Sequence, residues 1–123
     1  MKKQNSFAKV NGTCLYYEIA GSGDPLVLLH GFTGNTQWWD DQFEIFATHY
    51  QVIRYDIRGF GNSALPTRES YSHVDDLKAL LENLGISRTH VLGLSMGGEI
   101  AIDFALVYPE LTTALITVGS ALG

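Results

Sequence analysis

The stretch Gly93-Leu94-Ser95-Met96-Gly97 decides the fold of this chain because of what stands on either side of it. The apolar run at 89–92 leads directly into it, and a helix-like pattern follows it. A G-x-S-x-G sequence in this context marks a strand, a sharp turn and a helix, with the serine hydroxyl projecting above the sheet. Both glycines are expected because a Cβ at either position would crowd the strained turn.

On both sides of this turn, the chain alternates between patterns typical of strands and of helices. The Asn11-Gly12 pair lies between two β-prone runs and is a strong signal for a type I′ hairpin. Ser72 is suited to cap the start of a helix, and Gly85 is suited to follow its end. The expected strands are 7–10, 14–19, 26–29, 51–55, 89–94 and 115–118, and the expected helices are 36–48, the segment between Ser72 and Gly85, and 96–107.

The order of these elements is a hairpin followed by βαβαβαβ. That order predicts an α/β fold with a mainly parallel sheet and helices on both faces. The continuous apolar run at 26–29 is typical of a strand that is buried on both faces. The helix at 36–48 is expected to turn four aromatic side chains inward, namely Trp38, Trp39, Phe43 and Phe46.

The composition is that of a single globular domain spanning residues 1–123. A hydrophobic fraction of 46% is ordinary for a folded protein. The formal net charge of −5 argues against nucleic acid as a partner, since nucleic-acid binding needs a basic surface. Cys14 is the only cysteine, which excludes an intrachain disulfide and fits a reducing cytoplasm. No run reaches the ~18 apolar residues that a membrane span needs, so we expect no membrane partner.

Three loops are expected to converge at one edge of the sheet. These are the loops at 30–35 and 56–63 and the turn at Ser95, and each follows a strand. In an open α/β sheet, ligands bind beyond the carboxyl ends of the strands. Ser95 is therefore a candidate nucleophile, although a serine hydroxyl is weakly nucleophilic until a base takes its proton.

The main chain beside Ser95 is expected to stabilise negative charge. Met96 follows Ser95 at a helix N-terminus, where free N–H groups and the helix dipole favour an anion. Phe32 follows His30-Gly31 on the neighbouring loop, and its N–H group would be the second donor of an oxyanion hole. Gly31, Trp38 and Leu94 are the expected lining of an apolar substrate pocket. No cluster has the spacing of metal ligands, and no cofactor is implied.

The chain resembles the α/β-hydrolase family in three motifs that occur in order after successive strands. These are His30-Gly31-Phe32, the segment 56–63 with the sequence D-I-R-G-F-G-N-S, and the segment 93–98 with the sequence G-L-S-M-G-G. The second and third are most similar to the esterase, enol-lactonase and C–C hydrolase branch. The resemblance implies that Ser95 is a nucleophile for acyl transfer from carboxylic esters. Haloalkane dehalogenases and epoxide hydrolases of this family have an aspartate at that position.

The same resemblance assigns the triad acid and histidine to loops after later strands. After Ser95 the only acidic residues are Glu99, Asp103 and Glu110, on the helix or at its end, and no histidine follows. His30 is implied to be structural or to shape its loop, and not to act as the base. The chain thus resembles the N-terminal half of an α/β-hydrolase core, without the later strands and the cap.

Two functions are compatible with these observations. In the first, the chain is a serine hydrolase of small-molecule esters, or a fragment of one. In the second, it is a catalytically silent scaffold or a binding module for a small acyl ligand. In either case the apolar strand at 115–118 would be an unpaired edge, which predicts a homo-oligomer, most simply a twofold dimer, or pairing with a complementary C-terminal segment.

Overall fold

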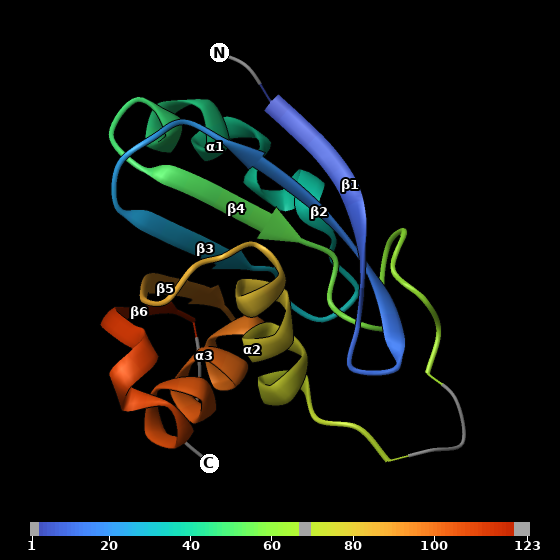
Figure 1. Cartoon of the computed structure of the whole chain (residues 1–123). Helices are drawn as coiled ribbons and strands as arrows, with labels where there is room; N and C mark the ends of the chain where they lie inside the picture. The colour runs from blue at the N-terminus through green and yellow to red at the C-terminus, as the bar shows by residue number, and fades with distance from the viewer. Residues whose placement is uncertain (1–2, 67–69, 120–123) are drawn as a thin grey trace.

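The Asn11-Gly12 turn joins two antiparallel strands, β1 (Lys3–Val10) and β2 (Thr13–Ala20), as the sequence predicts. Asn11 and Gly12 adopt φ values of 49° and 73°, the left-handed conformation that a type I′ turn requires. The computed structural model describes residues 3–66 and 70–119 (Figure 1). Within them, no helix combines the length and the apolar character needed to cross a membrane.

Six strands form one sheet in the order β1-β2-β4-β3-β5-β6. The central strands β4, β3 and β5 are parallel to one another, β6 is parallel to β5, and the hairpin joins antiparallel through β2. The remaining elements are β3 (Pro25–Leu29), η1 (Thr36–Trp39), α1 (Asp40–Ala47), β4 (Gln51–Tyr55), α2 (His73–Asn83), β5 (Thr89–Leu94), α3 (Met96–Val107), η2 (Pro109–Leu111) and β6 (Thr112–Val118).

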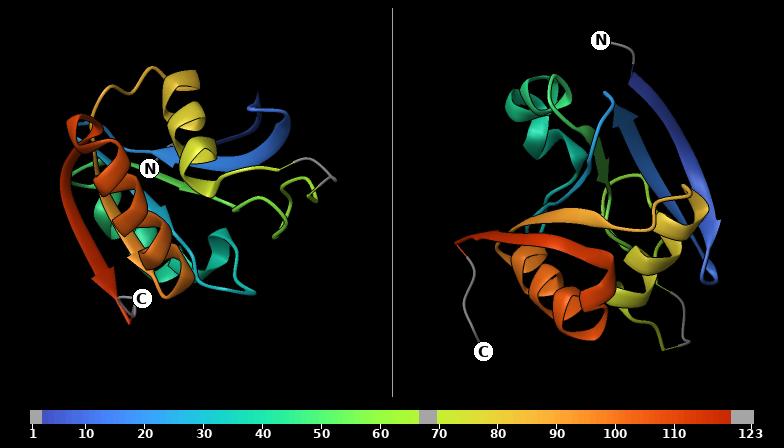
Figure 2. Two further views of the ribbon diagram at one scale, coloured as in Figure 1. Left: turned by 90° about the horizontal axis from the view of Figure 1, so that it is seen from below. Right: turned by 60° about the vertical axis from the view of Figure 1, so that its left-hand side comes forward.

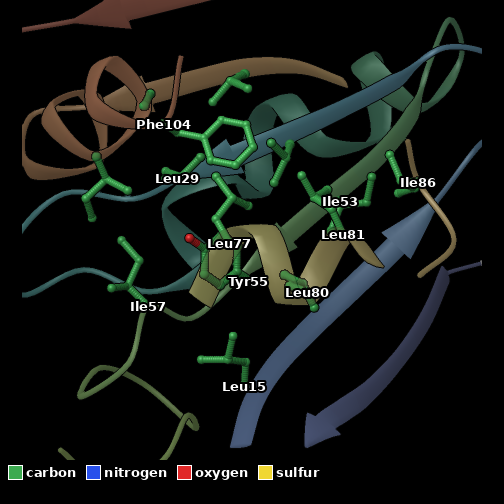
Figure 3. Packing of buried hydrophobic residues seen from close by; sticks show 14 of the residues in the cluster. Leu15, Leu29, Ile53, Tyr55, Ile57, Leu77, Leu80, Leu81, Ile86 and Phe104 are labelled. Carbon is green, nitrogen blue, oxygen red and sulfur yellow. The ribbon is translucent and has the colours of Figure 1, made fainter. Parts of the chain in front are cut away.

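Helices cover both faces of the sheet, which confirms the predicted α/β architecture (Figures 1 and 2). Alternate residues of β3 face opposite sides, because successive side chains of a strand point to opposite faces. Val27 and Leu29 pack toward α2 and α3, whereas Leu26 and Leu28 pack toward η1 and α1. Figure 3 shows the larger of these two clusters, in which leucines of α2 and Phe104 of α3 lie over β3 and β4.

The predicted helix at 36–48 is divided in the structure. Residues 36–39 form the 3₁₀ helix η1, and α1 begins at Asp40. The carbonyl oxygen of Thr36 accepts a hydrogen bond from Arg54 Nη1 at 3.0 Å, and the Asp40 N–H group donates instead to Gln37. Because the Arg54 side chain takes the acceptor that a continuous helix would use, the first turn tightens to a 3₁₀ geometry.

The starts of two strands also differ from the prediction, because pairing with a neighbouring strand outweighs the local sequence preference. β1 begins at Lys3 and not at residue 7, because β2 supplies a pairing partner for each of these polar residues. β6 begins at Thr112 and not at residue 115, for the same reason in its pairing with β5. Of the four aromatic residues expected to point inward, Trp39 and Phe43 are buried and Phe46 is half-buried. Trp38 is 45% exposed, which corrects the prediction for that side chain.

Candidate active site

Ser95 occupies a strained turn between β5 and α3. Its φ and ψ angles are 55° and −117°, and a positive φ is uncommon for a residue with a side chain. The turn is tight enough that a Cβ added to Gly93 would lie well within 3.0 Å of the main chain of Gly97. The glycine at 93 is therefore required by space, as the sequence predicts.

The first turn of α3 presents main-chain donors beside Ser95. Met96 is the first residue of α3, so its N–H group is one of the four that have no acceptor within the helix. Two donors further along the helix are already used, because the Gly98 and Glu99 N–H groups both donate to Ser95 O at 2.9 and 3.1 Å. The Met96 side chain is partly buried and packs against the larger core cluster.

The loop at 30–35, called the His30 loop below, lies directly beside the Ser95 turn. A Cβ added to Gly31 would be 2.7 Å from the Trp38 ring and 3.2 Å from Leu94 O. The structure thus brings together Gly31, Trp38 and Leu94, the three predicted pocket residues. Phe32 follows with its ring 64% exposed and edge-on to Phe60, at 5.7 Å between centroids.

His30 is fixed in its neutral form by two hydrogen bonds. The Ile57 N–H group donates to His30 Nε2 at 2.9 Å, so Nε2 must be the acceptor and Nδ1 carries the proton. His30 Nδ1 in turn donates to Gly31 O at 2.8 Å. Burial lowers the pKa of His30, although the Gly31 carbonyl and the Asp56 charge oppose this. These contacts support the structural role that the resemblance implies for His30.

The neutral state of His30 predicts a dependence of stability on pH. Because the pKa is lower in the folded state, the contribution of His30 is complete above the unfolded value of about 6.5 and is lost as the pH falls toward the folded pKa. His30→Gln keeps an acceptor for the Ile57 N–H group and does not titrate. We expect urea unfolding between pH 8 and 5 to show a shallower slope for this variant, by at most about 1.4 kcal/mol per pH unit. An unchanged slope would contradict the assignment.

The other histidines occupy three separate places. His49 lies in the turn after α1, and His90 lies near the start of β5, edge-on to Tyr50. His73 opens α2 at the end of the segment that carries Tyr71, and the two rings lie edge-on at 5.3 Å. Burial lowers the pKa of His73, against the effect of Asp76. Among residues 3–66 and 70–119, no three His, Cys, Asp or Glu side chains are grouped to hold a metal ion.

The loop at 56–63, called the Asp56 loop below, is organised by its own aspartate. The buried Asp56 carboxylate accepts from the Asn62 N–H group at 2.8 Å and from the Thr36 N–H group at 2.7 Å. The Arg58 guanidinium of this loop reaches outside it, to Asp76 of α2 and to Asn11 O of the hairpin.

Sequence reasoning did not identify the ion-pair network of Arg54, Glu18 and Asp40, in which Arg54 also donates to Thr36 O of η1. Arg54 of β4 is buried and binds Glu18 of β2 at 2.7 Å and Asp40 of α1 at 2.7 Å. Burial opposes the ionised form of Glu18, but hydrogen bonds from Tyr16 and Arg54 outweigh it and lower the pKa of Glu18. The sequence signal that could have revealed this network is Arg54, because an arginine in a strand expected to be buried must have a charged partner.

Comparison with known proteins relates this geometry to a family. The family model for the alpha/beta hydrolase fold matches residues 24–123. The chain is 37% identical over 106 residues to a putative carbamate hydrolase, RutD, of Azorhizobium caulinodans, covering 85% of this chain and 40% of the relative. It is 36% identical over 116 residues to Epoxide hydrolase 4 of Mus musculus, covering 89% of this chain and 32% of the relative. The chain therefore spans two fifths or less of the length of these curated relatives.

Solved structures show the same arrangement. The epoxide hydrolase CorEH superimposes with a TM-score of 0.92 at 31% identity, covering 97% of this chain and 43% of that one. A hydrolase from Pseudomonas aeruginosa PA01 superimposes with a TM-score of 0.90 at 31% identity, covering 98% of this chain and 48% of that one. With the family model matched over residues 24–123, the chain belongs to the α/β hydrolase fold family.

Proposed function

We propose that this chain carries the nucleophile and the oxyanion hole of a serine hydrolase that acts on small carboxylic esters. Ser95 Oγ would attack the acyl carbon, and the N–H groups of Phe32 and Met96 would bind the oxygen that becomes negative. The observation that carries the proposal is the strained conformation of Ser95, φ 55° and ψ −117°, at the start of α3. Strain of this kind is retained where the surrounding structure and a function require it.

The choice of substrate class rests on the identity of the nucleophile. The relatives named above are a putative carbamate hydrolase and an epoxide hydrolase. The family's epoxide hydrolases have an aspartate where this chain has Ser95. A serine alkoxide forms an ester with an acyl carbon, so esters and the chemically similar carbamates fit Ser95 better than epoxides do. Gly31, Trp38 and Leu94 would form the wall on the acyl side.

A fluorophosphonate probe tests whether Ser95 is activated. In the reaction the Ser95 oxygen bonds to phosphorus, the P–F bond breaks, fluoride leaves, and the hydroxyl proton passes to water or a buffer base. We expect intact-mass analysis to show one adduct on the folded chain and none on Ser95→Ala, because the variant lacks the attacking oxygen. A folded chain that takes no label would contradict the proposal.

The second candidate function is a catalytically silent binding module for a small acyl ligand. It is supported by His30, whose two ring nitrogens are both engaged in structural hydrogen bonds, so this histidine is not available as a base. A chain that binds a small acyl ligand but takes no fluorophosphonate would favour this function.

We also propose that the chain pairs with a second copy through β6. Among the described strands β6 is paired on one side only, by β5. It contains no charged residue or proline, and Ile116 and Val118 are 50% and 51% exposed. Natural edge strands are protected by such residues, and an unprotected edge pairs with another strand. Twofold pairing of β6 with β6 of a second copy would give hydrogen-bond partners to the edge N–H and C=O groups of both copies at once.

Charge on this edge is therefore expected to abolish self-association. Sedimentation of the 123-residue chain should show dimers that Ile116→Lys converts to monomers, because a lysine on an edge strand opposes pairing. Leu65→Lys is the matched control, since Leu65 is 77% exposed and lies outside the sheet. A monomeric unmodified chain at high concentration would overturn the dimer and leave a separate, complementary segment as the partner for β6.

A further inference from the structure

The His30 loop is held at both of its ends by the residues that follow β4. At its start, the Ile57 N–H group donates to His30 Nε2 at 2.9 Å. Immediately after its end, the N–H group of Thr36, the first residue of η1, donates to Asp56 Oδ1 at 2.7 Å. Phe32 lies between these two points. Two consecutive residues, Asp56 and Ile57, thus fix both ends of the loop that carries the Phe32 N–H group.

Thr36 is held by hydrogen bonds at both its N–H group and its carbonyl oxygen. Its N–H group binds Asp56, and its carbonyl oxygen accepts from Arg54 Nη1 at 3.0 Å. Thr36, Asp56 and Arg54 are all buried, so water does not compete for these bonds. The bonds to Asp56 and from Arg54 each involve a charged group, which makes them stronger than neutral hydrogen bonds.

The Asp56 carboxylate has no freedom to rotate away from Thr36. Its second oxygen accepts from the Asn62 N–H group at 2.8 Å. Gly61 adopts φ 52°, and a Cβ there would lie well within 3.0 Å of the same carboxylate. The tight turn of the Asp56 loop therefore fixes both carboxylate oxygens, one toward its own loop and one toward Thr36.

We propose that Asp56 is a positioning residue that sets the place of the Phe32 N–H group through its bond to Thr36. The inference rests on the proposed function only in taking that N–H group to be an oxyanion donor. Asp56 does not touch the substrate. Its effect is transmitted along the three residues between Phe32 and η1, and a displacement of about 1 Å at a reacting group can cost about 10²-fold in rate.

Thr36→Pro removes the bond without touching Asp56. Proline is tolerated at the first position of a helix, and Asn35 before it is already extended, with φ −163° and ψ −173°, as the residue before proline prefers. Asn35→Ala is the matched control, because it removes a hydrogen bond of the same turn, from the Gln37 N–H group to Asn35 Oδ1, and leaves the Asp56 bond intact. Asp56→Asn is a second variant. It removes the negative charge that strengthens the hydrogen bonds from the Thr36 and Asn62 N–H groups.

Two measurements on the whole chain distinguish a failure of the positioning role from a failure of the proposed function. The amide cross-peak of Phe32 in a ¹H–¹⁵N spectrum is expected to move in Thr36→Pro and Asp56→Asn and to stay in Asn35→Ala. The maximal rate of fluorophosphonate labelling is expected to fall about 10–100-fold in the same two variants, with the half-saturating probe concentration unchanged. A loss of stability alone would not lower the maximal labelling rate of the folded chain while leaving the half-saturating probe concentration unchanged.

The outcomes are distinct. If the unmodified chain takes no label, the proposed function fails, and the Phe32 cross-peak still tests the positioning by Asp56. If the unmodified chain is labelled and both variants, while folded, keep its labelling rate and its Phe32 cross-peak, the positioning role is overturned and the proposed function stands. If Thr36→Pro does not fold, Asp56→Asn carries the same two comparisons.

Discussion

Replacing Gly97 with alanine is expected to destabilise the chain by about 3 kcal/mol, the upper end of the cost of overpacking. A Cβ at position 97 would lie within 3.0 Å of the carbonyl oxygens of Leu29 and His30. These are main-chain atoms of a central strand and the loop after it, so they cannot rotate aside as a side chain would. Relief requires α3 to move away from β3, and this would displace Ser95 as well. Urea unfolding measures the loss, and the fluorophosphonate reaction reports the displacement.

Gly85→Ala is the control that separates a lack of space from backbone strain. Gly85 has φ 72°, which costs a residue with a side chain about 1–2 kcal/mol, but a Cβ there would meet nothing within 4 Å. Gly97 is not among the described residues with positive φ, so its cost comes from the contact alone. We therefore expect Gly97→Ala to be the more damaging change. The reverse order would show that α3 can shift away from β3 at little cost.

The elements that could be predicted from the sequence are those that local patterns determine. The Asn11-Gly12 turn requires two positive φ angles that few residue pairs tolerate, and the structure has them. β4, β5 and α3 have the predicted bounds. Ser72 caps α2 as expected, with its hydroxyl accepting from the Asp75 N–H group at 3.3 Å. In each case the residues that decide the conformation are neighbours in the chain.

The features that the sequence did not reveal depend on residues far apart. The division of the helix at 36–48 depends on Arg54, which lies on a different element and takes the Thr36 carbonyl oxygen. The hold on the His30 loop depends likewise on Asp56, 20 positions beyond Thr36. Periodicity and turn signals describe neighbours within a few residues, so neither pairing has a local pattern. The Ser95 turn was predictable because its glycines, serine and helix start are adjacent.

The Arg58–Asp76 pair also joins residues that are far apart in the chain, 18 positions from one another. Arg58 Nε and Nη2 donate to the two carboxylate oxygens of Asp76 at 2.9 and 2.7 Å, and both side chains are buried. Asn11 Nδ2 also donates to Asp76 at 2.8 Å, and the Arg58 guanidinium stacks over the Tyr71 ring at 4.3 Å. The pair thus connects the Asp56 loop, α2 and the hairpin turn.

Removing one partner of this pair is expected to have the largest effect on stability. Arg58→Met should lower the free energy of unfolding by about 3–5 kcal/mol, because Asp76 would remain as a buried charge without a counterion. In the double variant Arg58→Met/Asp76→Leu no charge is left uncompensated, so we expect most of the loss to be recovered. Lys78→Met is the matched control, since Lys78 pairs with Glu82 on the exposed side of the same helix, and it should leave the unfolding midpoint nearly unchanged. Urea unfolding of the three variants measures the loss of stability and its recovery. A double variant no more stable than Arg58→Met would show that the two residues contribute through shape and packing, and not through their charges.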